Sequence, residues 1–216
     1  MTTSDLPLGK RAQQAKDTRD KILKAAVRIF AKNGYAGGRI ESISKAAASN
    51  DRMIYYYFGS KEKLFIEVLE HIYLQFNQAE RKLKLDLADP AEALQRIVEF
   101  TWSYYLKHPE FVLILSTENL HRGKHSKKSA NIKTISSSIL ANLAPVLEAG
   151  QQRGLFRKDA SARNLYLTIS SLTYFYNSNQ YTLSVFMDED FASSTFQQEW
   201  LAHIKDVVMR SVLISL

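Results

Sequence analysis

Apolar residues recur at helical spacing along most of this chain, and no segment shows the strict alternation of a β-strand. The first apolar stripe, Ile22, Ala26 and Phe30, predicts a helix that ends at Asn33-Gly34. The pattern as a whole predicts an all-α protein of about nine helices. The expected helices cover residues 17–33, a short segment from residue 39, then 50–58, 60–85, 89–107, 111–120, 132–152, 162–187 and 196–214.

Residues 40–63 predict two short helices joined by a tight turn, followed by the start of a third. Asn50 is expected to cap the second helix by accepting a hydrogen bond from a backbone amide of its first turn. Ile54 and Phe58 give that helix a buried face, so its Arg, Met and Tyr side chains point outward. This arrangement is typical of a DNA-binding helix-turn-helix.

The net charge of +7 is confined to the segment that holds this motif. Residues 1–64 carry 13 Lys or Arg against 6 Asp or Glu, whereas residues 65–216 carry 16 of each. A basic segment on a neutral body is the electrostatic pattern of a nucleic-acid-binding protein. Residues 1–16 are interpreted as a flexible basic arm, which either lies along DNA or is a solvated tail.

The run IESISKAAASNDRMIYYYFGSKEKLF and its lead-in TRDKILKAAVRIFAKNGY resemble the DNA-binding segment of TetR-type transcriptional regulators. The phrase HPEFVLILSTENLHRG is similar to one group of TetR-type ligand domains. The resemblance implies an all-helical fold, a dimer, and a small effector held in a helical cavity. The matching positions are Ile22, Ala26, Phe30, Gly34, Tyr35, Ile43, Ala47, Tyr55, Phe58, Lys61 and Leu64.

Two positions depart from the TetR-type pattern. Ala48 stands where the family usually has Gly in the turn, so we expect a turn that does not need a positive φ. Gly38 stands where the family often has a capping Ser or Thr, so we expect a weakly capped second helix.

The candidate DNA-binding residues lie on and around the second helix of the motif. Arg52 can donate two hydrogen bonds to guanine, and Met53 can contact a thymine methyl group. Tyrosine hydroxyls and Lys61 suit phosphates, although tyrosines of this run could instead be packing residues. The full set is Arg39, Asn50, Arg52, Met53, Tyr55, Tyr56 and Lys61.

Polar and aromatic side chains interrupt the apolar helices between residues 100 and 180. Buried polar groups need partners, so such residues often line a pocket, although each could be a satisfied core or dimer contact. The candidate effector-binding residues are Trp102, Tyr105, Glu118, Asn119, His121 and Tyr176.

The last two expected helices predict a dimer. Residues 165–185 are apolar on most faces, more than one subunit needs, and the final helix of a partner would cover them. The candidate interface residues are Leu165, Leu172, Phe196, Trp200 and Val208.

Several function classes find no support in the sequence. The chain has no Cys, no nucleophilic Ser-His-Asp arrangement and no phosphate-binding glycine loop, so we expect no catalytic residues and no cofactor. Glu118 and His121 have the spacing of half a di-metal site, but the further carboxylates are missing, so no metal is expected. Without an apolar membrane span or a signal peptide, a cytoplasmic protein is expected.

The preferred hypothesis is a homodimeric transcriptional repressor that binds double-stranded operator DNA and is released by a small-molecule effector. Its domains would be the arm at 1–16, a helix-turn-helix domain at 17–64 and a ligand-binding and dimerisation domain at 65–216. A DNA-binding dimer with no effector is the alternative. An all-α enzyme with a basic surface is a third hypothesis.

Overall fold

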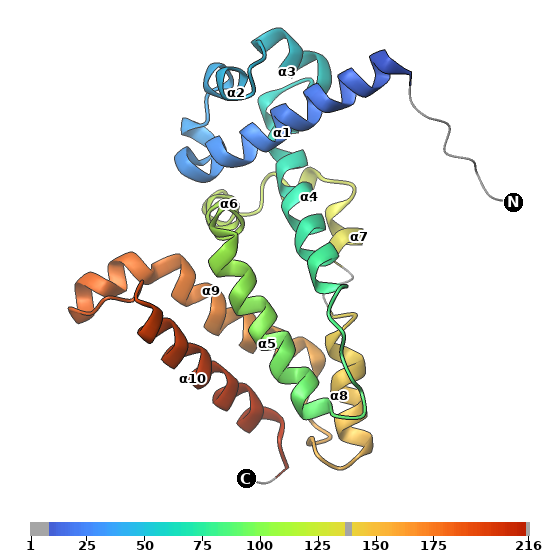
Figure 1. Cartoon of the computed structure of the whole chain (residues 1–216), viewed down its shortest axis with the longest axis vertical. Helices are drawn as coiled ribbons and strands as arrows, with labels where there is room; N and C mark the ends of the chain where they lie inside the picture. The colour runs from blue at the N-terminus through green and yellow to red at the C-terminus, as the bar shows by residue number, and fades with distance from the viewer. Residues whose placement is uncertain (1–8, 137–139, 215–216) are drawn as a thin grey trace, which may run out of the picture. The chain divides into compact units, whose positions relative to one another are not determined.

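The computed structural model describes residues 9–136 and 140–214, and the described part is all-α, with ten α-helices and one short 3-10 helix. Figure 1 shows the helices in chain order. Their bounds are α1 Lys10–Gly37, α2 Ile40–Ala46, α3 Asp51–Phe58, α4 Lys61–Glu80, α5 Pro90–Lys107, α6 Pro109–Leu120, η1 Ser126–Lys128, α7 Ile132–Ser136, α8 Leu143–Gln152, α9 Ala162–Met187 and α10 Ser194–Val212.

The chain divides into two compact units. Unit 1 contains the described residues up to His71 together with Leu113–Ser129. Unit 2 contains Ile72–Val112 and the described residues from Ala130 onward. Helices α4 and α6 therefore contribute residues to both units. The C-terminal part of α6 and the loop after it, which lie far beyond residue 64, pack within unit 1.

Unit 1 is built around α1, α2, α3 and the start of α4. Its core consists of apolar side chains that are almost fully buried, including Phe30, Ile43, Ile54 and Phe65. These are the positions that the helical stripes predicted. The rings of Phe30 and Phe65 meet edge to face, with centroids 5.0 Å apart.

Helix α1 begins earlier than the sequence predicted, at Lys10 rather than Asp17. Residues 10–16 are polar and lie on an exposed helical turn, so burial gives no signal for this extension. The part of the expected arm at residues 1–8 lies outside the described residues. At the other end, the expected stop at Gly34 is confirmed, because its φ of +66° interrupts the helix before Gly37.

The turn between α2 and α3 differs from the expectation. Ala48 has a φ of +50°, so the turn does need the left-handed region. A side chain with a Cβ in that region costs roughly 1 kcal/mol, and the flanking helices α2 and α3 impose the conformation.

Gly38 is required for close packing rather than for capping. A Cβ built at this position would lie 2.3 Å from Cδ1 of Phe30. The N-cap of α2 is Arg39, which makes no side-chain capping hydrogen bond. The expectation that Gly38 caps α2 is therefore wrong, although α2 does lack a side-chain cap, and the glycine is explained by the Phe30 ring beside it.

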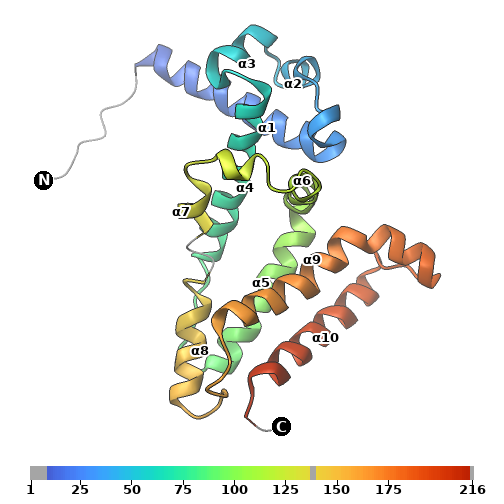
Figure 2. The same cartoon turned by 180° about the vertical axis from the view of Figure 1, so that it is seen from behind.

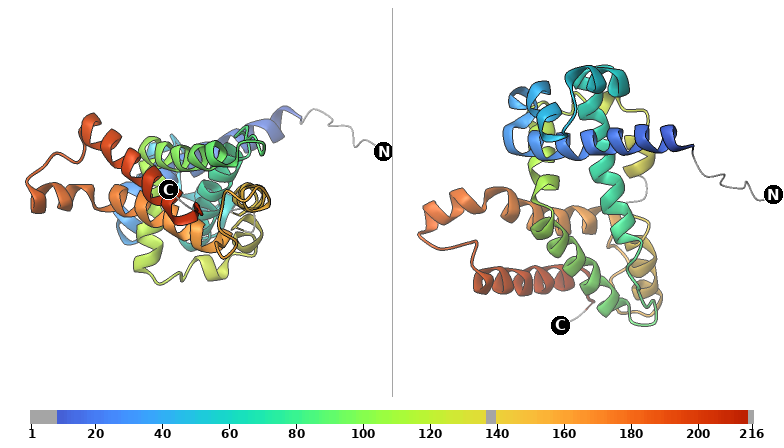
Figure 3. Two further views of the ribbon diagram at one scale, coloured as in Figure 1. Left: turned by 90° about the horizontal axis from the view of Figure 1, so that it is seen from below. Right: turned by 45° about the horizontal axis from the view of Figure 1, so that its top comes forward.

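Unit 2 is organised around α5, which packs against α8, α9 and α10 (Figure 2). Helix α5 begins where the sequence predicted: Asp89 caps it by accepting a hydrogen bond from Glu92 N at 3.0 Å, and Pro90 occupies its first turn. Helices α9 and α10 run side by side in opposite directions (Figure 3). The main core combines side chains of these helices, among them Ile97, Val146 and Ile204.

The single long helix expected over residues 132–152 is not observed. The described residues form α7, which ends at Ser136, and α8, which begins at Leu143, while residues 137–139 lie outside the described part. Pro145 does not kink a helix but lies in the first turn of α8. Backbone amides of a first turn have no intrahelical acceptor, so proline is tolerated there.

Candidate DNA-binding surface and effector site

Helix α3 is fixed by side chains at its N-terminal end. Asn50 caps it as predicted, because its Oδ1 accepts a hydrogen bond from Met53 N at 3.1 Å. The hydroxyl of Ser44, on α2, donates to Asp51 at 2.5 Å. These two contacts hold α3 against α2, while Ile54 and Phe58 bury its inner face.

The outer face of α3 presents the predicted side chains to solvent. Tyr56 is 77% exposed and Tyr55 is 50% exposed, so neither is an ordinary core residue. Arg52 is exposed as well, and Met53 is half-buried. The structure therefore gathers four of the seven candidates on one short helix of unit 1.

Lys61 lies in the first turn of α4, where it is half-buried. Its ammonium donates to the backbone oxygen of Ala36 at 3.1 Å and stands 4.9 Å from the centre of the Tyr35 ring. Burial lowers the pKa of Lys61. The ammonium is thus held near the protein surface instead of ranging through solvent.

Arg39 is exposed at the N-terminus of α2, as the sequence predicted. The orientation of α3 is further secured from α1 and α4. The guanidinium of Arg19 forms an ion pair with Glu67 and lies 4.9 Å from the centre of the Phe58 ring. Arg19 was not a sequence-based candidate, and its role is to brace the unit.

The candidate effector residues separate into two groups. Trp102, Tyr105 and Tyr176 belong to unit 2, where all three are buried. The ring centres of Trp102 and Tyr176 lie 4.9 Å apart, and the Tyr176 hydroxyl donates to Phe191 O. Tyr105 stacks on Phe111 with ring centres 5.5 Å apart.

The other three candidates belong to unit 1 and make local hydrogen bonds. Asn119 donates to Leu115 O at 2.9 Å, and Nδ1 of His121 lies 2.9 Å from Thr117 O. Glu118 does not pair with His121; it binds His125, whose Nδ1 lies 2.7 Å from the carboxylate. The carboxylate therefore pairs with a histidine seven residues away and not with the one at helical spacing, and no group of His, Asp and Glu in the described residues could hold a metal ion.

Sequence reasoning missed a polar cluster inside unit 2. Glu80 of α4 is 6% exposed, and burial raises its pKa to about 7, against an opposing effect of Arg81. Burial also raises the pKa of Tyr105. Four nearby side chains raise this pKa further: Tyr166, Tyr73, Tyr174 and Glu80. The cluster combines residues of α4, α5 and α9, so only the fold brings them together.

The buried Glu80 predicts a pH dependence of stability. A glutamate in an unfolded chain titrates near 4.3, so between about pH 4.5 and pH 7 the folded protein binds more protons than the unfolded chain. We expect the free energy of unfolding to fall as pH rises through this window, and Glu80→Gln to remove that component. Denaturant unfolding of both proteins between pH 4.5 and 8 measures it. Identical pH profiles would contradict the assignment.

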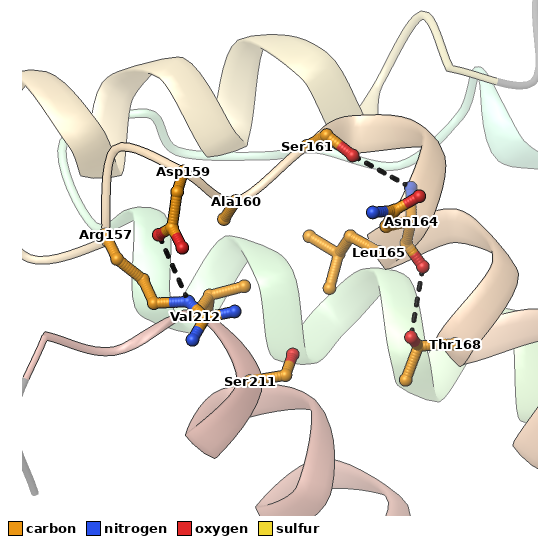
Figure 4. A pocket seen from close by; sticks show the side chains of 9 residues that line it. All are labelled: Arg157, Asp159, Ala160, Ser161, Asn164, Leu165, Thr168, Ser211 and Val212. Carbon is orange, nitrogen blue, oxygen red and sulfur yellow. Dashed lines mark hydrogen bonds and ion pairs between the residues drawn. The ribbon is translucent and has the colours of Figure 1, made fainter.

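Two hollows lie within unit 2. One holds about 110 Å³ at the start of α9, beside the Arg157–Asp159 ion pair and the Ser161 cap (Figure 4). The other holds about 210 Å³ between α4 and α7, where Asn77 has a buried Oδ1 with no hydrogen-bond partner among the described residues.

The candidate dimer residues divide between core and surface. Leu165 and Val208 are buried in the core of their own subunit, whereas Leu172, Phe196 and Trp200 are half-buried. The solvent-facing apolar surface of α9 comes from other residues. It consists of Leu167, Phe175, Tyr181, Val185, Phe186 and Met187, each more than half exposed.

A capped, solvent-facing helix on a basic helical unit defines the class of helix-turn-helix DNA-binding proteins. The model of the family "Bacterial regulatory proteins, tetR family" matches residues 22–68, and that of "Tetracyclin repressor-like, C-terminal domain" matches residues 90–208. The chain belongs to the TetR family of transcriptional regulators. It is a DNA-binding transcriptional regulator and not an enzyme, and regulators of this family respond to small-molecule effectors.

Individual relatives agree with this assignment. The chain is 59% identical over 204 residues to the HTH-type transcriptional repressor NicS of Pseudomonas putida strain KT2440. The aligned segment covers 94% of this chain and 96% of the relative. The fold is similar to that of a TetR family regulator from Marinobacter aquaeolei VT8, with a TM-score of 0.68, 21% identity, and coverage of 93% and 98%. A TetR regulator from Chloroflexus aurantiacus gives a TM-score of 0.68 at 16% identity, covering 94% and 100%.

None of the helices in the described part of the chain is both long and apolar enough to span a membrane.

Proposed function

We propose that this protein is a cytoplasmic, homodimeric repressor that binds double-stranded operator DNA through α3 and leaves it when a small molecule binds the body. The observation that carries the proposal is the exposed face of α3, which presents Arg52, Tyr55 and Tyr56 from a helix held by the Asn50 cap. The 59% identity to a protein described as a repressor supports repression rather than activation. Residues 17–64 are the DNA-binding domain, and residues 65–216 carry dimerisation and effector binding.

The contacts divide by chemistry. Arg52 and Met53 face base edges, because a guanidinium suits guanine and a thioether suits the thymine methyl group. Tyr55, Tyr56 and Lys61 hold phosphates and set the register of α3 in the major groove. Arg39 approaches the backbone at the exposed start of α2, and Asn50 contributes mainly by capping α3.

The two kinds of contact should respond differently to mutation. Lys61→Ala is expected to weaken binding about equally on operator and random DNA and to reduce the salt slope of log K by about 1 for each subunit. Arg52→Ala is expected to cost roughly 1–3 kcal/mol on the operator and to relax specificity at one base pair. Fluorescence anisotropy over a salt series measures both, on an operator selected from random duplexes by the wild-type protein.

The control for this pair is Leu87→Ala, which removes an exposed apolar side chain of unit 2 and should leave both affinities unchanged. If Lys61→Ala and Arg52→Ala lose the same affinity on both DNAs, the division into phosphate and base contacts is wrong.

Dimerisation uses the exposed apolar surface of α9. Six large apolar side chains of one helix, including Phe175 and Tyr181, are more than half exposed, and such a concentration is typical of an interaction site. A second subunit that covers this surface with its own α9 and α10 would form a four-helix interface. Two copies of α3 would then read half-sites about one turn apart, roughly 34–36 Å.

The effector site is proposed in unit 2, near Trp102, Tyr105 and Tyr176, with the Glu80 cluster nearby. Aromatic walls with a few polar groups suit a small aromatic or heterocyclic compound. Glu118, Asn119 and His121 remain candidates from unit 1. A thermal-shift screen of metabolites distinguishes this proposal from the alternative, a dimer that responds to no effector, because a ligand of the folded state raises the melting temperature.

Calorimetry decides whether a compound found in this way is an inducer. Coupling between two sites is reciprocal, so operator DNA must weaken effector binding by the same factor by which the effector weakens operator binding. A factor of about 5 to 150 is expected for a coupling of roughly 1–3 kcal/mol. Equal effector affinities with and without operator would exclude release by that compound.

A further inference from the structure

The loop after α6 is tied to unit 1 by one buried carboxylate. Oε1 of Glu118 accepts hydrogen bonds from the backbone amides of His125 and Ser126, each at 2.8 Å. Oε2 lies 2.7 Å from Nδ1 of His125, which therefore carries the proton that it donates. Glu118 is 5% exposed and His125 is fully buried. The carboxylate thus holds the imidazole directly through Nδ1 and fixes the loop that carries it through two backbone amides.

The imidazole ring in turn forms one wall for Tyr35. The ring centres of His125 and Tyr35 lie 4.4 Å apart, and His125 also meets Phe65 at 4.8 Å. Tyr35 directly follows Gly34, where the backbone of α1 leaves the helical conformation. Four rings hold the Tyr35 ring, those of Phe30, Phe65, His121 and His125, and the centre of the His125 ring is the nearest of them.

The exposed side of the Tyr35 ring supports the Lys61 ammonium, which lies 4.9 Å from the ring centre. Attraction between a cation and the face of an aromatic ring favours this position. A continuous series of contacts therefore runs from Glu118 through His125 and Tyr35 to Lys61, entirely within unit 1.

We propose that His125 is a positioning residue for DNA binding: its ring, fixed by Glu118, supports Tyr35 and so holds Lys61 ready for a phosphate. This role rests on the proposed function of Lys61 as a phosphate contact. A preplaced ammonium loses less side-chain freedom on binding than a solvated lysine does, so the contact is stronger. Glu118, which the sequence suggested as an effector-binding residue, acts in this proposal through His125 on the DNA-binding unit.

Two substitutions of His125 separate this role from a purely structural one. His125→Asn keeps an N–H donor for Glu118 near the position of Nδ1 but removes the ring that supports Tyr35. His125→Phe keeps the ring but leaves Oε2 of Glu118 without its imidazole partner. The phenylalanine variant should be the less stable of the two, because loss of a partner from a buried charge is costly. For operator affinity we expect the opposite order, with His125→Phe binding DNA more tightly than His125→Asn.

The measurement is operator affinity across a salt series, with stability followed by denaturant unfolding. For His125→Asn, the Kd ratio between 200 and 50 mM salt should be roughly tenfold smaller than for the wild type, the loss of one phosphate contact in each subunit of the dimer. His125→Phe should keep the wild-type ratio. The double variant His125→Asn/Lys61→Ala should match Lys61→Ala alone. DNA affinities that simply follow stability, or effects that add in the double variant, would overturn the proposal.

A second readout does not depend on DNA. Because the Lys61 ammonium lies over the Tyr35 ring, the ring current should shift the NMR signal of the adjacent methylene protons upfield. His125→Asn should return the signal towards that of a solvated lysine, and His125→Phe should not. An unchanged signal in His125→Asn overturns the positioning role. If the signal responds but Lys61→Ala leaves the salt slope intact, the phosphate assignment of Lys61 has failed instead.

Discussion

Phe175→Arg is expected to convert the protein to monomers and to lower operator affinity at least about 100-fold, because two linked half-site contacts become one. Phe175 is 55% exposed within its own subunit, so the change should leave the fold intact. In the proposed interface it would bury an unpaired guanidinium, which costs several kcal/mol. Light scattering measures the mass, and fluorescence anisotropy on the selected operator measures the affinity.

The matched control is Leu87→Arg. Leu87 is also an exposed apolar residue of unit 2, but it belongs to the turn before α5 and not to α9. This variant should remain a dimer with wild-type affinity. A Phe175→Arg protein that stays dimeric at micromolar concentration would exclude the α9 surface as the interface.

Phe30→Ala should have the largest effect on stability. Truncation of a fully buried phenylalanine typically costs about 3–5 kcal/mol, and Phe30 is 0% exposed at the centre of unit 1. Because the whole stability of a domain is of the same order, we expect unit 1 to unfold near physiological temperature and operator binding to be lost. Circular dichroism during heating and anisotropy on DNA follow the two effects.

Leu120→Ala provides the comparison, since this side chain of unit 1 is 80% exposed and its loss should leave the unfolding of unit 1 unchanged. A Phe30→Ala protein that melts within a degree of the wild type would show that the core of unit 1 does not depend on this ring. The Gly38 contact would then also need another explanation.

Local chemistry made much of the fold predictable. Asn50, Asp89 and Ser60 each stand directly before a helix, and each side chain accepts a hydrogen bond from the first turn, as their residue types suggested. The end of the first helix was predictable for the same reason, from Gly34 and from the apolar stripe of α1. These features depend on neighbours only a few residues away, which a single sequence contains.

Features that depend on distant neighbours were not predictable. Ala48 adopts a positive φ because two packed helices fix the turn between them, and Gly38 is required by a ring eight positions earlier in the chain. Glu118 was paired with His121 by helical spacing, but the loop carries His125 back to the carboxylate. The raised pKa of Glu80 likewise reflects burial that only the assembled helices create.

The candidate sites follow the same division. Exposure of Arg52, Tyr55 and Tyr56 could be predicted, because the buried stripe of a short helix determines its outer face. The sequence could not show in the same way which candidate dimer residues face solvent, since α9 is apolar on several faces. Periodicity alone could not tell that Leu165 faces the core of its own subunit while Phe175 faces solvent.

The confinement of all excess positive charge to residues 1–64 has a kinetic consequence. Attraction between these side chains and phosphates is independent of sequence, and an effector bound in the body leaves it in place. A repressor released from its operator therefore transfers mainly to neighbouring chromosomal duplex instead of escaping into free solution. When the effector is consumed, the repressor returns to its operator by a short slide along DNA. The rate at which the effector is removed therefore determines how soon repression resumes.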